Sequence, residues 1–128
     1  MTRIHTHSDR GPAAIGPYSQ GIWAGDLLYL SGQTPIDPAT GKLIDGDVEA
    51  QTHRCFDNLL AILGDAGLTS DDVIKCNVYL TDMVDFPAMN AAYKTRFASP
   101  YPARTTVAVA GLPLGARVEI ELVARRSR

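Results

Sequence analysis

Residues Asp47–Ala66 read DVEAQTHRCFDNLLAILGDA, and their apolar side chains recur at alternating steps of four and three. Side chains at this spacing share one face of an α-helix. The stripe consists of Val48, Thr52, Cys55, Leu59, Ile62 and Ala66. Asp47 can cap the first turn, and Gly67 can adopt the left-handed conformation that ends a helix. The stretch predicts one long amphipathic helix packed on a core.

The chain after this helix predicts three strands and a second helix. The β-branched and aromatic residues of Asp72–Thr81 favour a strand. Alternation would place Val73, Lys75, Asn77 and Tyr79 on one face and Ile74, Cys76, Val78 and Leu80 on the other. A helix is expected over Phe86–Phe97, with Asn90 and Tyr93 along one side, and strands over Arg104–Ala110 and Arg117–Ala124.

The chain before the long helix predicts a short strand near Arg3–Thr6, a hairpin of Ser19–Trp23 with Leu27–Ser31, and a loop over Thr34–Gly46. The order β-β-β-α-β-α-β-β predicts a single α+β domain over residues 1–128, a mixed sheet with two helices on one face. The other face would carry small and apolar residues such as Ala108, Ala110 and Val123. We expect self-association to bury it.

Composition restricts the function classes. The formal net charge is −2, without the basic excess typical of nucleic-acid or membrane-surface binding. No apolar run approaches the roughly 18 residues of a membrane span, and the N-terminus lacks the apolar block of a signal peptide. We expect a cytoplasmic protein in which Cys55 and Cys76 are buried free thiols. His5 and His7 lack a third ligand, so no metal is predicted, and no cofactor motif is present.

Two strands offer candidates for catalysis. Arg104 follows Pro102 at a strand start and shares a face with Thr106. A guanidinium fixed there suits bidentate capture of a carboxylate, and a surface salt bridge is the alternative. Glu119 and Glu121 share a face of the last strand, where either could act as a general base or face solvent. Alternation alone does not decide between these acids.

Glycine-flanked polar residues are further candidates. They lie in GPYSQ at Gly16–Gln20 and in LSGQ at Leu30–Gln33. Tyr18 and Ser31 offer hydroxyls, and Gly32 would let a ligand reach a backbone N–H group. Turn formation and a buried tyrosine with a hydrogen-bond partner explain the same residues equally well.

In order and at fitting spacing, these motifs resemble the RidA/YjgF family of reactive-intermediate deaminases, also described as endoribonuclease L-PSP-like. PARTTVAVAGLP at Pro102–Pro113, followed by VEIE at Val118–Glu121, is similar to the family signature. Gly16–Gln20 and Ser31–Gln33 resemble its N-terminal motifs, and the helix with Phe86, Met89, Asn90 and Tyr93 resembles the helix after the fourth long strand. The resemblance covers nearly the whole chain.

The resemblance implies a chorismate-mutase-like fold and a homotrimer with active sites in the clefts between subunits. It implies cofactor-free hydrolysis of 2-aminoacrylate and related enamine or imine acids to 2-oxo acids and ammonia. Arg104 would bind the substrate carboxylate. Glu119, rather than Glu121, would activate water, and its strand would be next to that of Arg104. The Gly32 N–H would be a second donor. The pocket would be lined by Tyr18, Ser31, Asn90 and Thr106.

Thr106 stands where the best-known deaminases carry cysteine. Because an imine is already electrophilic, water can attack it without a thiol nucleophile, so this departure bears on substrate range rather than reaction type. One alternative is an endoribonuclease that inhibits translation; the charge of −2 argues against it, and its RNA binding would weaken steeply with salt. The others are a non-catalytic trimer that binds small 2-oxo acids and a deaminase specialised for another imine.

Overall fold

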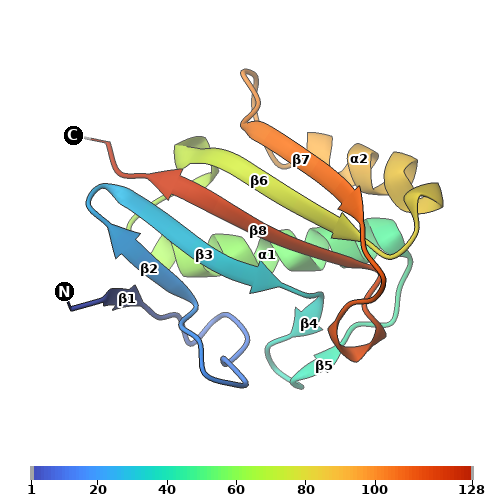
Figure 1. Ribbon diagram of the computed structural model, residues 1–128, viewed down its shortest axis with the longest axis horizontal. Helices are drawn as coiled ribbons and strands as arrows, with labels where there is room; N and C mark the ends of the chain where they lie inside the picture. The colour runs from blue at the N-terminus through green and yellow to red at the C-terminus, as the bar shows by residue number, and fades with distance from the viewer. Residues whose placement is uncertain (1, 128) are drawn as a thin grey trace.

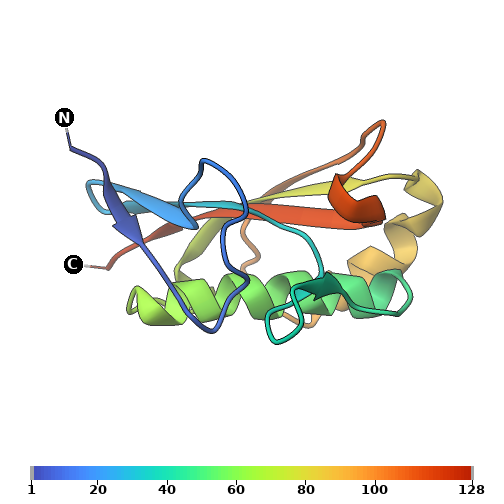
Figure 2. The same ribbon diagram turned by 90° about the horizontal axis from the view of Figure 1, so that it is seen from below.

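The computed structural model describes residues 2–127, so the two ends of the predicted domain, Met1 and Arg128, lie outside the described residues. Within that range a six-stranded mixed sheet carries two helices on one face (Figure 1). The turned view shows both α-helices on the same side of the sheet (Figure 2). The predicted α+β architecture, with both helices on one face, is therefore confirmed.

The sheet has the spatial order β1-β2-β3-β8-β6-β7. Its strands are β1 (Ile4–Thr6), β2 (Gly21–Ala24), β3 (Leu27–Gln33), β6 (Val73–Leu80), β7 (Ala103–Ala108) and β8 (Val118–Arg125). Neighbours pair antiparallel except β6 and β7, which run parallel. The helices are α1 (Val48–Asp65) and α2 (Phe86–Lys94), with 3-10 turns at Ser70–Asp72, Met83–Asp85 and Pro113–Gly115. Over residues 2–127, neither helix has the length and apolar character that a membrane crossing requires.

Helix α1 forms for the local reasons that its sequence predicts. The Asp47 carboxylate accepts a hydrogen bond from the Ala50 N–H at 2.9 Å, and Gly67 adopts φ 80° just beyond the end. Four members of the predicted stripe, Thr52, Cys55, Leu59 and Ile62, are fully buried against the sheet. The buried thiols of Cys55 and Cys76 also agree with the prediction, since both are free and inaccessible.

The predicted loop over Thr34–Gly46 contains a small hairpin, so this prediction was incomplete. Strand β4 (Ile36–Asp37) pairs with β5 (Lys42–Leu43). The Asp37 carboxylate accepts from the Ala39 N–H at 2.9 Å, and Gly41 takes φ 72°. The turn residues were recognised correctly, but strands of two residues are too short to show alternation.

The predicted alternation along β6 fails at its first residues. Val73 is buried and Ile74 is 44% exposed. The prediction placed Ile74 on the same face as the buried Cys76, so the reverse burial was expected. The pairing with β8 shifts register between Val73 and Lys75. A bulge of this kind changes the side-chain phase of a strand, so alternation holds only from Lys75 onward.

The open face of the sheet is more polar than predicted. The Tyr79 hydroxyl and the Asn77 amide donate to the Glu121 carboxylate, and Lys75 donates to Thr105 at 3.0 Å. Val123 lies on this face as expected. Ala108 does not, because it pairs with the helix-facing Leu80, and Ala110 lies beyond β7. The surface expected to drive self-association is therefore a mixture of polar and apolar groups.

Candidate functional site

The seven predicted site residues separate into two groups on opposite faces of the sheet. Tyr18, Ser31, Gly32 and Glu119 line one cavity of about 430 Å³. Arg104 and Asn90 line another of about 390 Å³. Thr106 shares the face of Arg104, two residues further along β7, but lines neither cavity.

The Glu119 cavity is built on a bulge in β3. Leu30 pairs with Leu122 and Gln33 pairs with Ile120, so Ser31 and Gly32 together face a single residue of β8. Bulges of this kind redirect side chains and are frequent beside functional sites. The Ser31 hydroxyl donates to the backbone carbonyl of Ser19 at 2.6 Å, which ties the bulge to the segment before β2.

Gly32 makes room for the carboxylate of Glu119. A Cβ atom at position 32 would lie 2.8 Å from Glu119 Oε1, closer than real Cβ contacts. Burial, and then the charge of Glu121, raise the pKa of Glu119 above its ordinary value. A partly desolvated carboxylate with a raised pKa is suited to accept a proton from water.

The loop that forms one wall of this cavity is held by a buried amide. The Gln20 side chain, 2% exposed, accepts from the Ser8 N–H at 2.6 Å and donates to the carbonyls of Ser8 and Pro12 at 3.1 and 2.9 Å. Ile15 and Tyr18 lie between these anchored points and line the cavity. The sequence motif predicts Tyr18 as a pocket residue, whereas the anchoring role of Gln20 depends on contacts with a distant segment.

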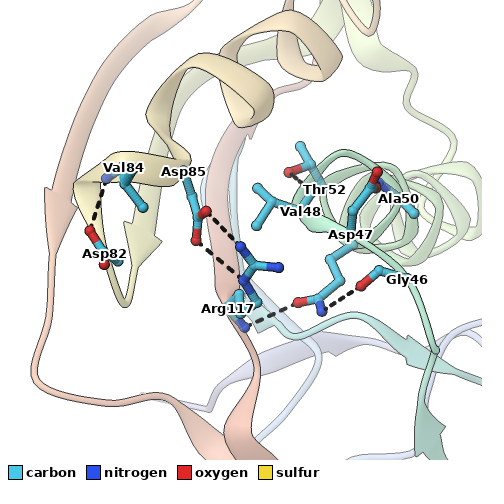
Figure 3. A network of polar contacts seen from close by, with 10 residues as sticks. Gly46, Asp47, Val48, Ala50, Thr52, Asp82, Val84, Asp85 and Arg117 are labelled. Carbon is cyan, nitrogen blue, oxygen red and sulfur yellow. Dashed lines mark hydrogen bonds and ion pairs between the residues drawn. The ribbon is translucent and has the colours of Figure 1, made fainter.

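The start of β8 is fixed by a polar network two residues before Glu119 (Figure 3). The Arg117 backbone N–H donates to Gln51 Oε1 at 3.1 Å, and Gln51 Nε2 donates to the Gly46 carbonyl at 3.3 Å. The Arg117 guanidinium donates to Asp85 Oδ1 at 2.6 Å. Asp85 directly precedes α2, so this network joins the strand of Glu119 to the helix of the second cavity.

The second cavity presents an oriented guanidinium. Arg104 Nη1 donates to Asn90 Oδ1 at 2.8 Å, and the guanidinium carbon lies 4.6 Å from the Tyr93 ring centre and 5.6 Å from that of Phe86. Stacking and one amide hydrogen bond restrict the plane of the guanidinium group, while its other N–H groups stay available. Tyr101 contributes to the cavity wall.

No carboxylate in residues 2–127 forms an ion pair with Arg104, so the surface salt bridge considered from the sequence is absent there. Within the same range, the buried hydroxyl of Thr106 has no hydrogen-bond partner. A guanidinium with no carboxylate partner and with N–H groups left over can bind a small anion.

Arg104 and Glu119 do not lie on neighbouring strands, contrary to the sequence-based expectation. Strand β6 lies between β7 and β8, so the two backbones are about 10 Å apart. Arg104 is paired with the helix-facing Cys76, whereas Glu119 is paired with Tyr79 of the open face. The two side chains therefore leave the sheet in opposite directions, and one small molecule cannot contact both within a single chain.

The sequence does not predict the position of two cavity residues, Leu114 and Tyr93. Leu114 lies in the Glu119 cavity in a left-handed conformation, φ 59°, within a turn that the sequence marked only by its proline and glycines. The Tyr93 ring lies under Arg104, although spacing had placed Tyr93 only on a helix face. Both placements depend on tertiary contacts between segments distant in sequence.

Comparisons with known proteins agree with this fold and with the sequence motifs. The family model described as "Endoribonuclease L-PSP" matches residues 8–126. "Protein DfrA" of Myxococcus xanthus is 47% identical over 126 residues, covering 97% of this chain and 96% of its own. A mouse protein named "2-iminobutanoate/2-iminopropanoate deaminase" is 45% identical over 115 residues, 90% of this chain and 85% of its own.

A crystal structure of RidA from an Antarctic Psychrobacter superposes with a TM-score of 0.92 at 43% identity, over 97% of this chain and 100% of that one. The match of the family model covers both cavities and every strand of the sheet except β1. The chain is therefore a member of the RidA/YjgF family, the family described as endoribonuclease L-PSP.

Proposed function

We propose that this chain is a cofactor-free deaminase that hydrolyses 2-aminoacrylate and related imino acids to 2-oxo acids and ammonia. The observation that carries the proposal is Arg104, whose guanidinium is oriented by Asn90 and Tyr93 but has no carboxylate partner in residues 2–127. A substrate carboxylate would complete this site with two parallel hydrogen bonds. The mouse relative named as an imine deaminase supports the same reaction class.

In the proposed mechanism, the enamine tautomerises to an imine, and Glu119 removes a proton from water while the water oxygen bonds to the imine carbon. The C=N bond becomes a C–N single bond, and Glu119 passes the proton taken from water to the nitrogen. The carbinolamine then transfers its hydroxyl proton to the nitrogen; a C=O bond forms, the C–N bond breaks, and ammonia and the 2-oxo acid are released. The Gly32 N–H is assigned to the substrate as a second donor, and Tyr18, Ser31, Asn90 and Thr106 to the pocket walls.

We propose that the complete site forms between two copies of the chain in a cytoplasmic homotrimer. Arg104 and Glu119 leave opposite faces of the sheet, so a second copy must supply one of them. One copy then contributes the Arg104 guanidinium that binds the anion. Its neighbour contributes the Glu119 carboxylate and the bulge at Gly32.

The first experiment generates 2-aminoacrylate in solution and follows its disappearance. The wild type should accelerate it, and Arg104→Ala should lose at least about 100-fold in kcat/KM. Arg104→Lys should also be impaired, because an ammonium group cannot form the two parallel hydrogen bonds of a guanidinium. Arg3→Ala, at an exposed arginine, is the matched control. No acceleration by wild type, or an undiminished Arg104→Ala, refutes the proposal.

The second experiment tests the shared site by subunit mixing. Arg104→Ala and Glu119→Ala chains are inactive alone, but mixed trimers place an intact Arg104 opposite an intact Glu119 at about one interface in four. Roughly a quarter of wild-type activity should return after the two are unfolded and refolded together. A mixture without activity, alongside active wild-type chains refolded in the same way, refutes the shared site.

A further inference from the structure

The rim of the Glu119 cavity is apolar, and the proposed chemistry does not use it. Leu114 is 66% exposed and Ile15 is 76% exposed, and both line the cavity. Among its described lining residues Glu119 is the one carboxylate, and no lysine, arginine or histidine occurs. A ligand that enters this cavity meets one acidic group and an otherwise uncharged wall.

Leu114 occupies this rim in a conformation that leucine disfavours. Its φ of 59° lies in the left-handed region, where glycine and asparagine are accommodated far more readily than a branched side chain. Gly115 follows at φ 76° and keeps the turn closed. Strained residues gather at ligand-binding segments, and here the strained residue places an aliphatic side chain in the wall of the cavity that contains Glu119.

We propose that Leu114 makes the site selective for imino acids with uncharged side chains and against those with a second carboxylate. The inference rests on the proposed function, in which Arg104 of the other half-site binds the first carboxylate. A second carboxylate would enter the Glu119 cavity, lose water against an apolar rim, and approach Glu119 without a counter-charge. A lysine at position 114 would supply that counter-charge at the same place.

The test compares two imino acids made in solution by amino-acid oxidases, one from 2-aminobutanoate and one from glutamate. Wild type should favour the first by at least about 100-fold in kcat/KM. Leu114→Lys should lower the ratio of the two kcat/KM values by at least about fivefold, and this decrease should be smaller at high salt. Leu114→Gln, of similar length but uncharged, should change it by less than about twofold.

Each outcome separates the two hypotheses. If wild type accelerates neither reaction, the proposed function is overturned. If it accelerates both equally, deamination stands and the selectivity is overturned. Equal ratios for Leu114→Lys and Leu114→Gln overturn the role of charge at the rim. Ile15→Lys places an ammonium on the same rim without backbone strain, and it replaces Leu114→Lys if that variant does not fold.

Discussion

Replacing Gly32 by alanine tests the closest contact in the Glu119 cavity. The new Cβ would lie 2.8 Å from Glu119 Oε1, 3.1 Å from Cδ and 3.2 Å from Cγ, whereas ordinary contact begins at 3.4 Å. The carboxylate must therefore move by about 0.6 Å. Misplacing a reacting group by about 1 Å costs about 100-fold, so we expect Gly32→Ala to lose about tenfold to 100-fold in kcat/KM.

Stability should change far less, by about 1 kcal/mol, because the atoms displaced belong to the end of a flexible side chain. The measurements are kcat/KM for 2-aminoacrylate and the free energy of unfolding in urea. Gly111→Ala is the matched control, because a Cβ there has no atom within 4 Å and the backbone needs no positive φ. Wild-type kcat/KM in Gly32→Ala would show that the position of Glu119 does not limit the reaction.

Three further predictions concern stability and reactivity. Burial raises the folded pKa of Glu119 above 4.5, so the folded chain holds more protons than the unfolded chain and stability falls as pH rises above that value. Glu119→Gln should therefore be more stable than wild type at about pH 8 and lose this advantage below about pH 4.5; a pH-independent difference in urea unfolding would contradict this. Gln20→Leu leaves the buried Ser8 N–H unpaired and should lower the free energy of unfolding by about 2–4 kcal/mol. A decrease below about 1 kcal/mol would refute the anchoring role of Gln20. Burial raises the pKa of Cys76 to about 11 and that of Cys55 further, so a thiol reagent near pH 8 should label native protein at least about 100-fold more slowly than unfolded protein; similar rates would show that the thiols are accessible.

The sequence predicted those features that depend on near neighbours. Helix α1 carries its cap at Asp47, its stop at Gly67 and its apolar stripe within 21 residues, and all three appear in the structure. The order of the strands along the chain was predicted for the same reason. The motifs around Arg104 and Glu119 identified the family without any knowledge of how strands pair.

Spatial relations between distant segments were predicted less well. Alternation assigns residues to faces within one strand, but it does not say that β6 lies between β7 and β8. For that reason Arg104 and Glu119 were expected on neighbouring strands. The bulge that exposes Ile74 also depends on the partner strand, as does the conformation of Leu114. These features are set by pairing and packing, which a single sequence does not reveal.

The separation of Arg104 from Glu119 bears on how such a protein diversifies. The side chains that orient Arg104 come from α2, whereas those around Glu119 come from β3 and the loop before β2. Within one chain the sheet separates these two groups, and the contact between Arg117 and Asp85 is a link between the strand of Glu119 and the helix of Asn90. In the proposed function, a substitution beside Arg104 would therefore act first on anion binding, and one beside Glu119 on the activation of water.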